Sequence, residues 1–139
     1  MFNSPGFSVG SGAWQSTSVD GIADTGTTLL LLPDSVVKAY YAEVSGSKYD
    51  SEQGGYTYPC SPTPPDFHMG VGDGSIVIPG KYINYATISQ SRSSSTCYGG
   101  IQSNSGIGFS IFGDIALKSA FVVFDAQNMQ IGWASKKLN

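Results

Sequence analysis

Asp24 is the residue of this sequence whose surroundings best suit it to chemistry. Residues 21–28 read GIADTGTT and run directly into four leucines. A carboxylate that is held in place between apolar strands can serve as a general base. Gly26 lets the backbone point an N–H group at the carboxylate, and the hydroxyls of Thr25 and Thr27 can lock neighbouring groups. The same residues also fit an ordinary Asx turn at the end of a strand, so the motif alone leaves both interpretations open.

Two strands and a helix are predicted to position this motif. Ile22 and Ala23 lead into it with apolar side chains on both faces, and 29–32 reads as a buried strand. The helix is predicted to begin after Pro33, with Asp34 or Ser35 as its cap. Its apolar residues recur at spacings of three and four, and Gly46 closes it; they are Val36, Val37, Tyr40, Tyr41 and Val44.

The rest of the chain reads as short strands joined by tight turns. Glycine supplies 18 of the 139 residues and aromatic residues 12%, a composition that favours strands and turns. We therefore predict an all-β fold with two short helices, the second over 115–120, in one domain spanning 1–139. Further strands are predicted at 7–9, 14–16, 56–58, 67–71, 75–78, 82–88, 97–101, 106–112, 121–124 and 130–133, with turns at 72–74 and 125–128 and a polar loop at 90–96.

Composition excludes several classes of function. Only 12% of the residues are charged and the net charge is −3, without the basic clusters of a nucleic-acid-binding protein. No apolar run reaches the roughly 18–20 residues of a membrane span. His68 is the single histidine, so a histidine metal site or a Ser-His-Asp triad would depend on it alone. We expect no metal, no cofactor, no nucleic acid and no membrane.

The two cysteines leave two alternatives. Cys60 and Cys97 do not have the spacing of a CxxC metal or redox site. They are either two buried thiols or one disulfide, which would close a loop of roughly 38 residues and stabilise the fold by about 3–4 kcal/mol. We favour the disulfide, which would indicate an oxidising compartment.

Several segments together carry a resemblance to a known family. The sequence of 24–28, DTGTT, preceded by GIA, resembles the second active-site motif of pepsin-like aspartic proteases. The segment 111–114, IFGD, resembles the apolar-apolar-Gly-Asp segment that lies beneath that motif. Residues 121–125 and 131–134 resemble the closing hairpin of the family, and 99–108 is similar to its fungal members. The two cysteines fall where those lobes carry their disulfide.

The resemblance implies a bilobal all-β endopeptidase in which two aspartates share one proton and activate a water molecule. It implies that Asp24 is one of these aspartates, that Thr25 grips its counterpart across the lobe interface, and that Thr27 bonds the outer carboxylate oxygen. Gly26 and Thr28 would contact the backbone of a peptide or protein substrate, and pepstatin-type inhibitors would bind. Apolar subsites would be lined by Ile22, Leu31, Ile107 and Ile111.

The sequence also departs from the family, because it contains only one DTG. We therefore expect a single C-terminal-type lobe over 1–139, without the N-terminal lobe and flap, and inactive alone. Asp114 is expected at a helix start rather than as the second catalytic acid. The partner of Asp24 would come from an N-terminal lobe or from a second copy of this chain. A third alternative is a non-catalytic binding module that exposes the lobe interface. Localisation is expected to be secreted, extracellular or vacuolar.

Overall fold

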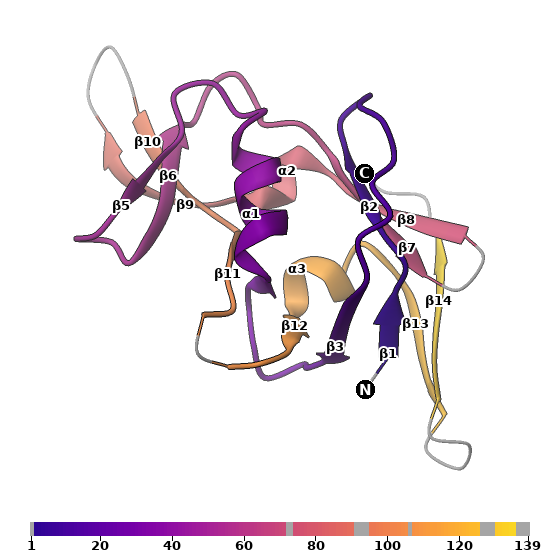
Figure 1. Ribbon diagram of the computed structural model, residues 1–139. Coiled ribbons are helices and arrows are strands. Elements are labelled where there is room, and N and C mark those ends of the chain that lie inside the picture. Colours follow the sequence, from indigo (N-terminus) through magenta and orange to yellow (C-terminus); the bar gives the residue numbers. More distant parts are fainter. Residues whose placement is uncertain (1, 72–73, 91–94, 106, 126–129, 136–139) are drawn as a thin grey trace.

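Short strands are the main secondary structure of the described residues, as the sequence predicts. The computed structural model describes residues 2–71, 74–90, 95–105, 107–125 and 130–135. Figure 1 shows β5, β6, β9 and β10 at one end of the molecule and β8, β13 and β14 at the other, with α1 between them. The elements are β1 (Phe2–Ser4), β2 (Phe7–Val9), β3 (Val19–Ala23), β4 (Leu30–Leu32), α1 (Asp34–Tyr41), β5 (Lys48–Asp50), β6 (Gly55–Pro59), β7 (Phe67–Val71), β8 (Gly74–Ile78), α2 (Gly80–Ile83), β9 (Asn84–Gln90), β10 (Ser95–Gly99), β11 (Ile101–Ser103), β12 (Ser110–Phe112), α3 (Asp114–Leu117), β13 (Ala120–Asp125) and β14 (Gln130–Ser135).

A five-stranded sheet carries the Asp24 motif. Its strand order is β1-β3-β12-β4-β11. The central strand β12 runs parallel to β3 and antiparallel to β4, so that Ile111 lies opposite Ile22 on one side and Leu31 on the other. Asp24 follows the last residue of β3, and the loop from Asp24 to Leu29 crosses the end of β12 to reach β4. A strand distant in the sequence therefore fixes both ends of the motif.

The other strands form three smaller sheets, with orders β5-β6-β10-β9, β2-β7-β8 and β13-β14. The disulfide predicted between Cys60 and Cys97 is present. Cys97 lies in β10 and Cys60 directly follows β6, the strand with which β10 pairs. The bond therefore links two neighbouring strands of one sheet and closes a sequence separation of 37 residues.

Helix α1 buries the apolar face that its spacing predicts. Its buried residues are Val36, Val37, Tyr40 and Tyr41. The predicted side-chain cap is wrong, because Pro33 occupies the N-cap position and no side chain caps the helix. Asp34 instead accepts a hydrogen bond from the hydroxyl of Ser103, which ties the start of α1 to the end of β11. The helix also ends before Gly46, whose positive φ places it in the following turn.

The core surrounds α1 and contains several tyrosines. Tyr40 donates to the carbonyl of Pro65 and Tyr41 to that of Ile101. Burial raises the pKa of Tyr40, Tyr41 and Tyr58 well above the usual value, so these phenols are neutral in the folded protein. Large side chains that are almost fully buried around them include Phe67, Phe112, Leu30, Leu32, Met69, Ile76, Ile78, Ile83, Ile101 and Ile115.

Several predicted boundaries are wrong. Residues 14–16 form no strand, because β2 pairs with β7 and meets the 14–16 segment only at the Phe7–Gln15 bridge. The strand predicted over 82–88 begins at Asn84, since Pro79 starts the short helix α2. The strand predicted over 106–112 is confined to β12, because Gly108 has a φ of +89°. The predicted turns at 72–74 and 125–128 and the predicted loop at 90–96 fall partly outside the described residues.

Candidate active site

The Asp24 carboxylate is held at both of its oxygens. The backbone N–H of Gly26 donates to Oδ1 at 2.8 Å, and the hydroxyl of Thr27 donates to Oδ2 at 2.9 Å. The backbone N–H of Asp24 donates to the carbonyl of Phe112 in β12 at 3.1 Å. Asp24 is half-buried. The carboxylate is thus fixed in orientation while one side remains accessible, which is the arrangement that a preorganised catalytic acid or base requires.

Both sequence interpretations of the motif are present in this geometry. The bond from Gly26 N–H to Oδ1 joins residues two apart, which is the Asx-turn contact. The bond from Thr27 adds a second donor that an Asx turn does not need. A Cβ at Gly26 would lie 3.2 Å from Oδ1, so a side chain there would crowd the carboxylate. The turn therefore serves as the support of the carboxylate.

The loop that carries Asp24 rests on the start of α3. Three carbonyl groups of the loop accept hydrogen bonds from backbone N–H groups there. The absence of a side chain at Gly113 lets the loop come this close to α3, because a Cβ on Gly113 would lie 2.4 Å from the carbonyl oxygens of Thr27 and Leu29. Position 113 therefore admits only glycine without movement of the loop. The three bonds run from Asp114 N to Thr27 O (2.8 Å), from Ile115 N to Thr28 O (3.1 Å) and from Gly113 N to Leu29 O (3.2 Å).

Asp114 contributes its backbone to the site. It is the first residue of α3 and its N–H supports Thr27, but no side chain caps this helix. Asp114 therefore lies at a helix start, as expected, but Gly113 occupies the N-cap position and the Asp114 carboxylate makes no capping hydrogen bond. Thr25 and Thr28, which the resemblance assigns to a partner lobe and to substrate, are both exposed on the loop.

Three of the four predicted apolar contact residues lie side by side. Ile22, Ile111 and Leu31 are in register across β3, β12 and β4, and each is half-buried. They form an apolar row on the sheet face that points away from the core. Ile107 lies apart from this row, in the loop between β11 and β12, with 39% of its surface exposed.

Asn104 organises this loop and was missed by sequence reasoning. Its backbone N–H donates to Leu32 O at 2.8 Å, and its carbonyl accepts from Ile107 N at 3.0 Å. Its side-chain amide donates to Phe109 O at 3.0 Å and to Ser110 Oγ at 3.4 Å. The Asn-Ser-Gly sequence is a turn signal, but its partners could not be identified without the fold.

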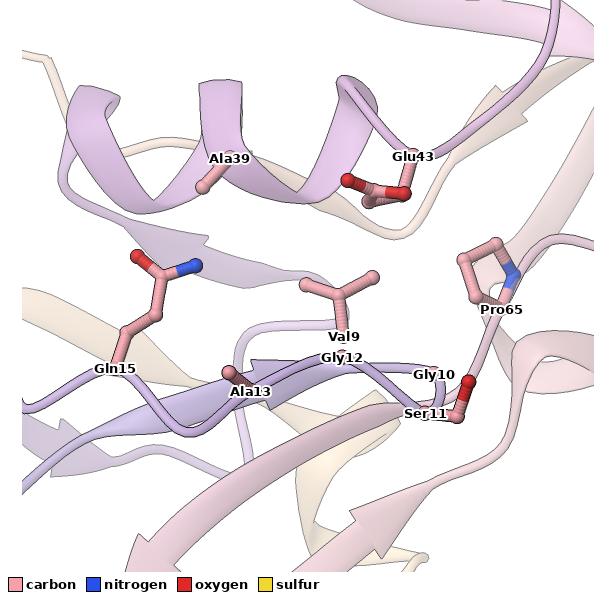
Figure 2. A pocket seen from close by; sticks show the side chains of 9 residues that line it. All are labelled: Val9, Gly10, Ser11, Gly12, Ala13, Gln15, Ala39, Glu43 and Pro65. Carbon is pink, nitrogen blue, oxygen red and sulfur yellow. The ribbon is translucent and has the colours of Figure 1, made fainter.

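A hollow of about 580 Å³ lies elsewhere, between α1 and the segment from β2 to Gln15. Figure 2 shows Val9 and Gln15 pointing toward α1, with Ala39 facing them from the helix and Glu43 from the turn that follows it. None of the candidate residues lines it. The described residues contain no group of three or more His, Cys, Asp or Glu side chains that could hold a metal ion. Within the described part of the chain, no helix is long and apolar enough to cross a membrane.

Comparison with known proteins gives consistent matches. The family model described as eukaryotic aspartyl protease matches residues 1–136. Aspergillopepsin-1 of Aspergillus fumigatus is 59% identical over 134 residues, covering 96% of this chain and 33% of the relative. Endothiapepsin of Cryphonectria parasitica is 60% identical over 136 residues, covering 97% and 32%. Penicillopepsin-2 of Penicillium janthinellum is 57% identical over 133 residues, covering 96% and 33%. The chain spans about a third of the length of these curated relatives.

Proposed function

Because this chain belongs to the eukaryotic aspartyl protease family, we propose that it supplies one of the two catalytic aspartates of an aspartic endopeptidase. The observation that carries the proposal is the Asp24 carboxylate, held by Gly26 and Thr27 at the accessible end of β3. A carboxylate with a fixed orientation can share a proton with a second carboxylate placed close to it. Asp24 is assigned as catalytic, and Gly26 and Thr27 as its support.

The proposed chemistry is hydrolysis of a peptide bond by an activated water molecule. One carboxylate of the pair accepts a proton from the water, and the other donates a proton to the carbonyl oxygen of the substrate. The water oxygen attacks the carbonyl carbon, and the C–N bond then breaks with proton transfer to the leaving amine. The donors on Asp24 keep it aligned through these transfers, so little reorganisation is needed when the charge moves.

A peptide or protein substrate is proposed to lie across the loop and the apolar row. Gly26 and Thr28, which are both exposed, are proposed to contact its backbone. Ile22, Leu31 and Ile111 offer a continuous half-buried apolar surface beside the motif, which suits apolar substrate side chains. The more distant Ile107 would extend this surface from its loop. Pepstatin-type inhibitors are expected to bind at the same place.

The second carboxylate is proposed to come from another lobe. We assign the chain as a C-terminal-type lobe whose partner is an N-terminal lobe, with the exposed Thr25 gripping its counterpart across the interface. Alone, the chain is expected to be inactive, because a single carboxylate cannot form the shared-proton pair. The Cys60–Cys97 disulfide supports folding in an oxidising compartment, so a secreted, extracellular or vacuolar location is proposed.

The proposal is tested in a chimera of endothiapepsin whose matching segment is replaced by residues of this chain. The chimera should cleave an unfolded protein at pH 3–5, and pepstatin should block this cleavage. Asp24→Asn should abolish cleavage without unfolding the chimera. Asp114→Asn is the matched control, because that exposed carboxylate accepts no capping bond. Loss of activity in the control and retention in Asp24→Asn would reverse the assignment.

A second assay separates the proposal from its alternatives. The 139-residue chain is tested alone at pH 3–5, with its mass measured by light scattering. A folded, inactive monomer is the expected result. Pepstatin-sensitive cleavage by a dimer would instead mean that two copies of Asp24 form the pair about a twofold axis. An inactive chain in an inactive chimera would favour the non-catalytic binding module.

A further inference from the structure

We propose that Asn104 is a positioning residue that sets substrate preference. By holding Ile107 in place beside the apolar row, it makes the assembled enzyme prefer a large apolar side chain at one position of the substrate. The row is formed by Ile22, Ile111 and Leu31. This inference rests on the proposed function, because it concerns one subsite of the same site.

The strand register places the connection from β11 to β12 at the end of the row that is away from Asp24. Asp24 follows β3, whose last residue pairs with Phe112 at one end of β12. Ser110, at the other end of β12, pairs with Gly21, and the connection from β11 arrives there. Two residues of a strand span about 7 Å, which is also the length of two residues of an extended peptide. A substrate whose scissile bond lies at Asp24 can therefore reach this end of the row with a side chain close to that bond.

Asn104 ties the two ends of this connection together. Its backbone N–H donates to Leu32 O at the end of β4 (2.8 Å), and its carbonyl accepts from Ile107 N (3.0 Å). Its side-chain amide donates to Phe109 O at 3.0 Å and to Ser110 Oγ at 3.4 Å. An asparagine amide has two N–H donors, so these bonds use both of them. A single residue thus joins the end of β4, Ile107 and the start of β12.

Ile107 depends on these bonds because packing does little to hold it. Its exposed fraction is 39%, whereas the apolar side chains of the core are almost fully buried. The next residue, Gly108, has a φ of +89°, a backbone conformation that other residues rarely adopt. An apolar side chain that is fixed before the substrate arrives binds more tightly, because less conformational entropy is lost on binding. The hydrogen bonds of Asn104 therefore supply the order that an exposed subsite residue lacks.

The test uses the endothiapepsin chimera and pairs of peptide substrates that differ only by leucine or alanine at one position. This position is varied over the residues on both sides of the scissile bond, and the leucine preference is the ratio of the two kcat/KM values. The variants are Asn104→Ala, Ile107→Ala and the double variant. Ser105→Ala is the matched control, because it removes an exposed hydroxyl next to Asn104 while the backbone N–H keeps its bond to Ser103 Oγ. Melting curves establish that each variant is folded.

At one position the parent chimera should prefer leucine by at least roughly tenfold, the discrimination that an apolar subsite gives. Asn104→Ala and Ile107→Ala should each lower this preference by at least about threefold, because the subsite loses its order or its apolar surface. Ser105→Ala should leave the preference unchanged. In the double variant, the loss of Asn104 should add nothing to the loss of Ile107, because Asn104 acts through Ile107.

Three results would overturn the proposal while the proposed function stands, because the chimera would still cleave. The first is an unchanged leucine preference in Asn104→Ala. The second is an equal loss of kcat/KM on all substrates, which would indicate a purely structural role. The third is a further loss of preference when Asn104→Ala is added to Ile107→Ala. An inactive parent chimera would instead refute the proposed function, and this inference with it.

Discussion

Substitution of Gly113 by alanine should displace the Asp24 loop. The new Cβ would lie 2.4 Å from the carbonyl oxygens of Thr27 and Leu29, where at least 3.0 Å is needed. The loop must therefore move by about 0.6 Å or more, the difference between these two distances. Overpacking of this kind costs about 1–3 kcal/mol, and weakening the bonds from the start of α3 adds about 1 kcal/mol.

A loss of about 2–4 kcal/mol should lower the melting temperature of a chain of this size by roughly 7–14 °C. The assay is thermal unfolding followed by circular dichroism, together with hydrogen exchange of the Asp114 and Ile115 amides, which the loop carbonyls protect. Gly74→Ala is the matched control, because no atom lies within 4 Å of a Cβ there. If Gly113→Ala melted at the temperature of the control with unchanged exchange, the argument that glycine is required beneath the loop would be refuted.

Three further perturbations test the rest of the fold. Replacing Cys60 and Cys97 by alanine should lower the free energy of unfolding by about 3–4 kcal/mol in urea titrations, and alkylation of two thiols in the unreduced, unfolded protein would contradict the bond. Asn104→Asp replaces an amide donor by a carboxylate that faces the carbonyl of Phe109. Hydrogen exchange at the Ile107 amide should therefore accelerate roughly tenfold. Unchanged exchange would mean that the Asn104 side chain does not hold the loop between β11 and β12 in place. Burial raises the pKa of three core tyrosines. The stability that these buried, neutral tyrosines give the fold should be fully present below about pH 10, the pKa of an unfolded tyrosine, and should be lost as the pH rises above that value. The measurement is the free energy of unfolding as a function of pH. If all tyrosines of the folded protein titrated near pH 10, this prediction would be contradicted.

Local patterns in the sequence were sufficient for the elements that position the motif. The spacing of Val36, Val37, Tyr40 and Tyr41 predicts the buried face of α1, and the leucine run predicts β4. The donors to the carboxylate, Gly26 and Thr27, are close to Asp24 in the sequence, so their hydrogen bonds could be anticipated.

What the sequence did not predict depends on contacts between distant segments. The pairing of β2 with β7 overrides a local hairpin, because β7 offers a complete strand. The N-cap positions of α1 and α3 are Pro33 and Gly113, and neither helix has a side-chain cap, although Asp34 or Ser35 was expected to cap α1. The hydrogen bond from Asn104 N to Leu32 O joins two segments that only the folded sheet brings together.

The most direct test of the central claim is the turnover number of the endothiapepsin chimera with and without Asp24→Asn. Both proteins would be assayed on one unfolded protein substrate at pH 3–5, after matched melting curves show that both are folded. If Asp24 is half of the catalytic pair, the substitution should lower the turnover number by about 10⁴-fold or more while Asp114→Asn retains it. A turnover number within tenfold of the parent would show that the carboxylate held by Gly26 and Thr27 is not catalytic.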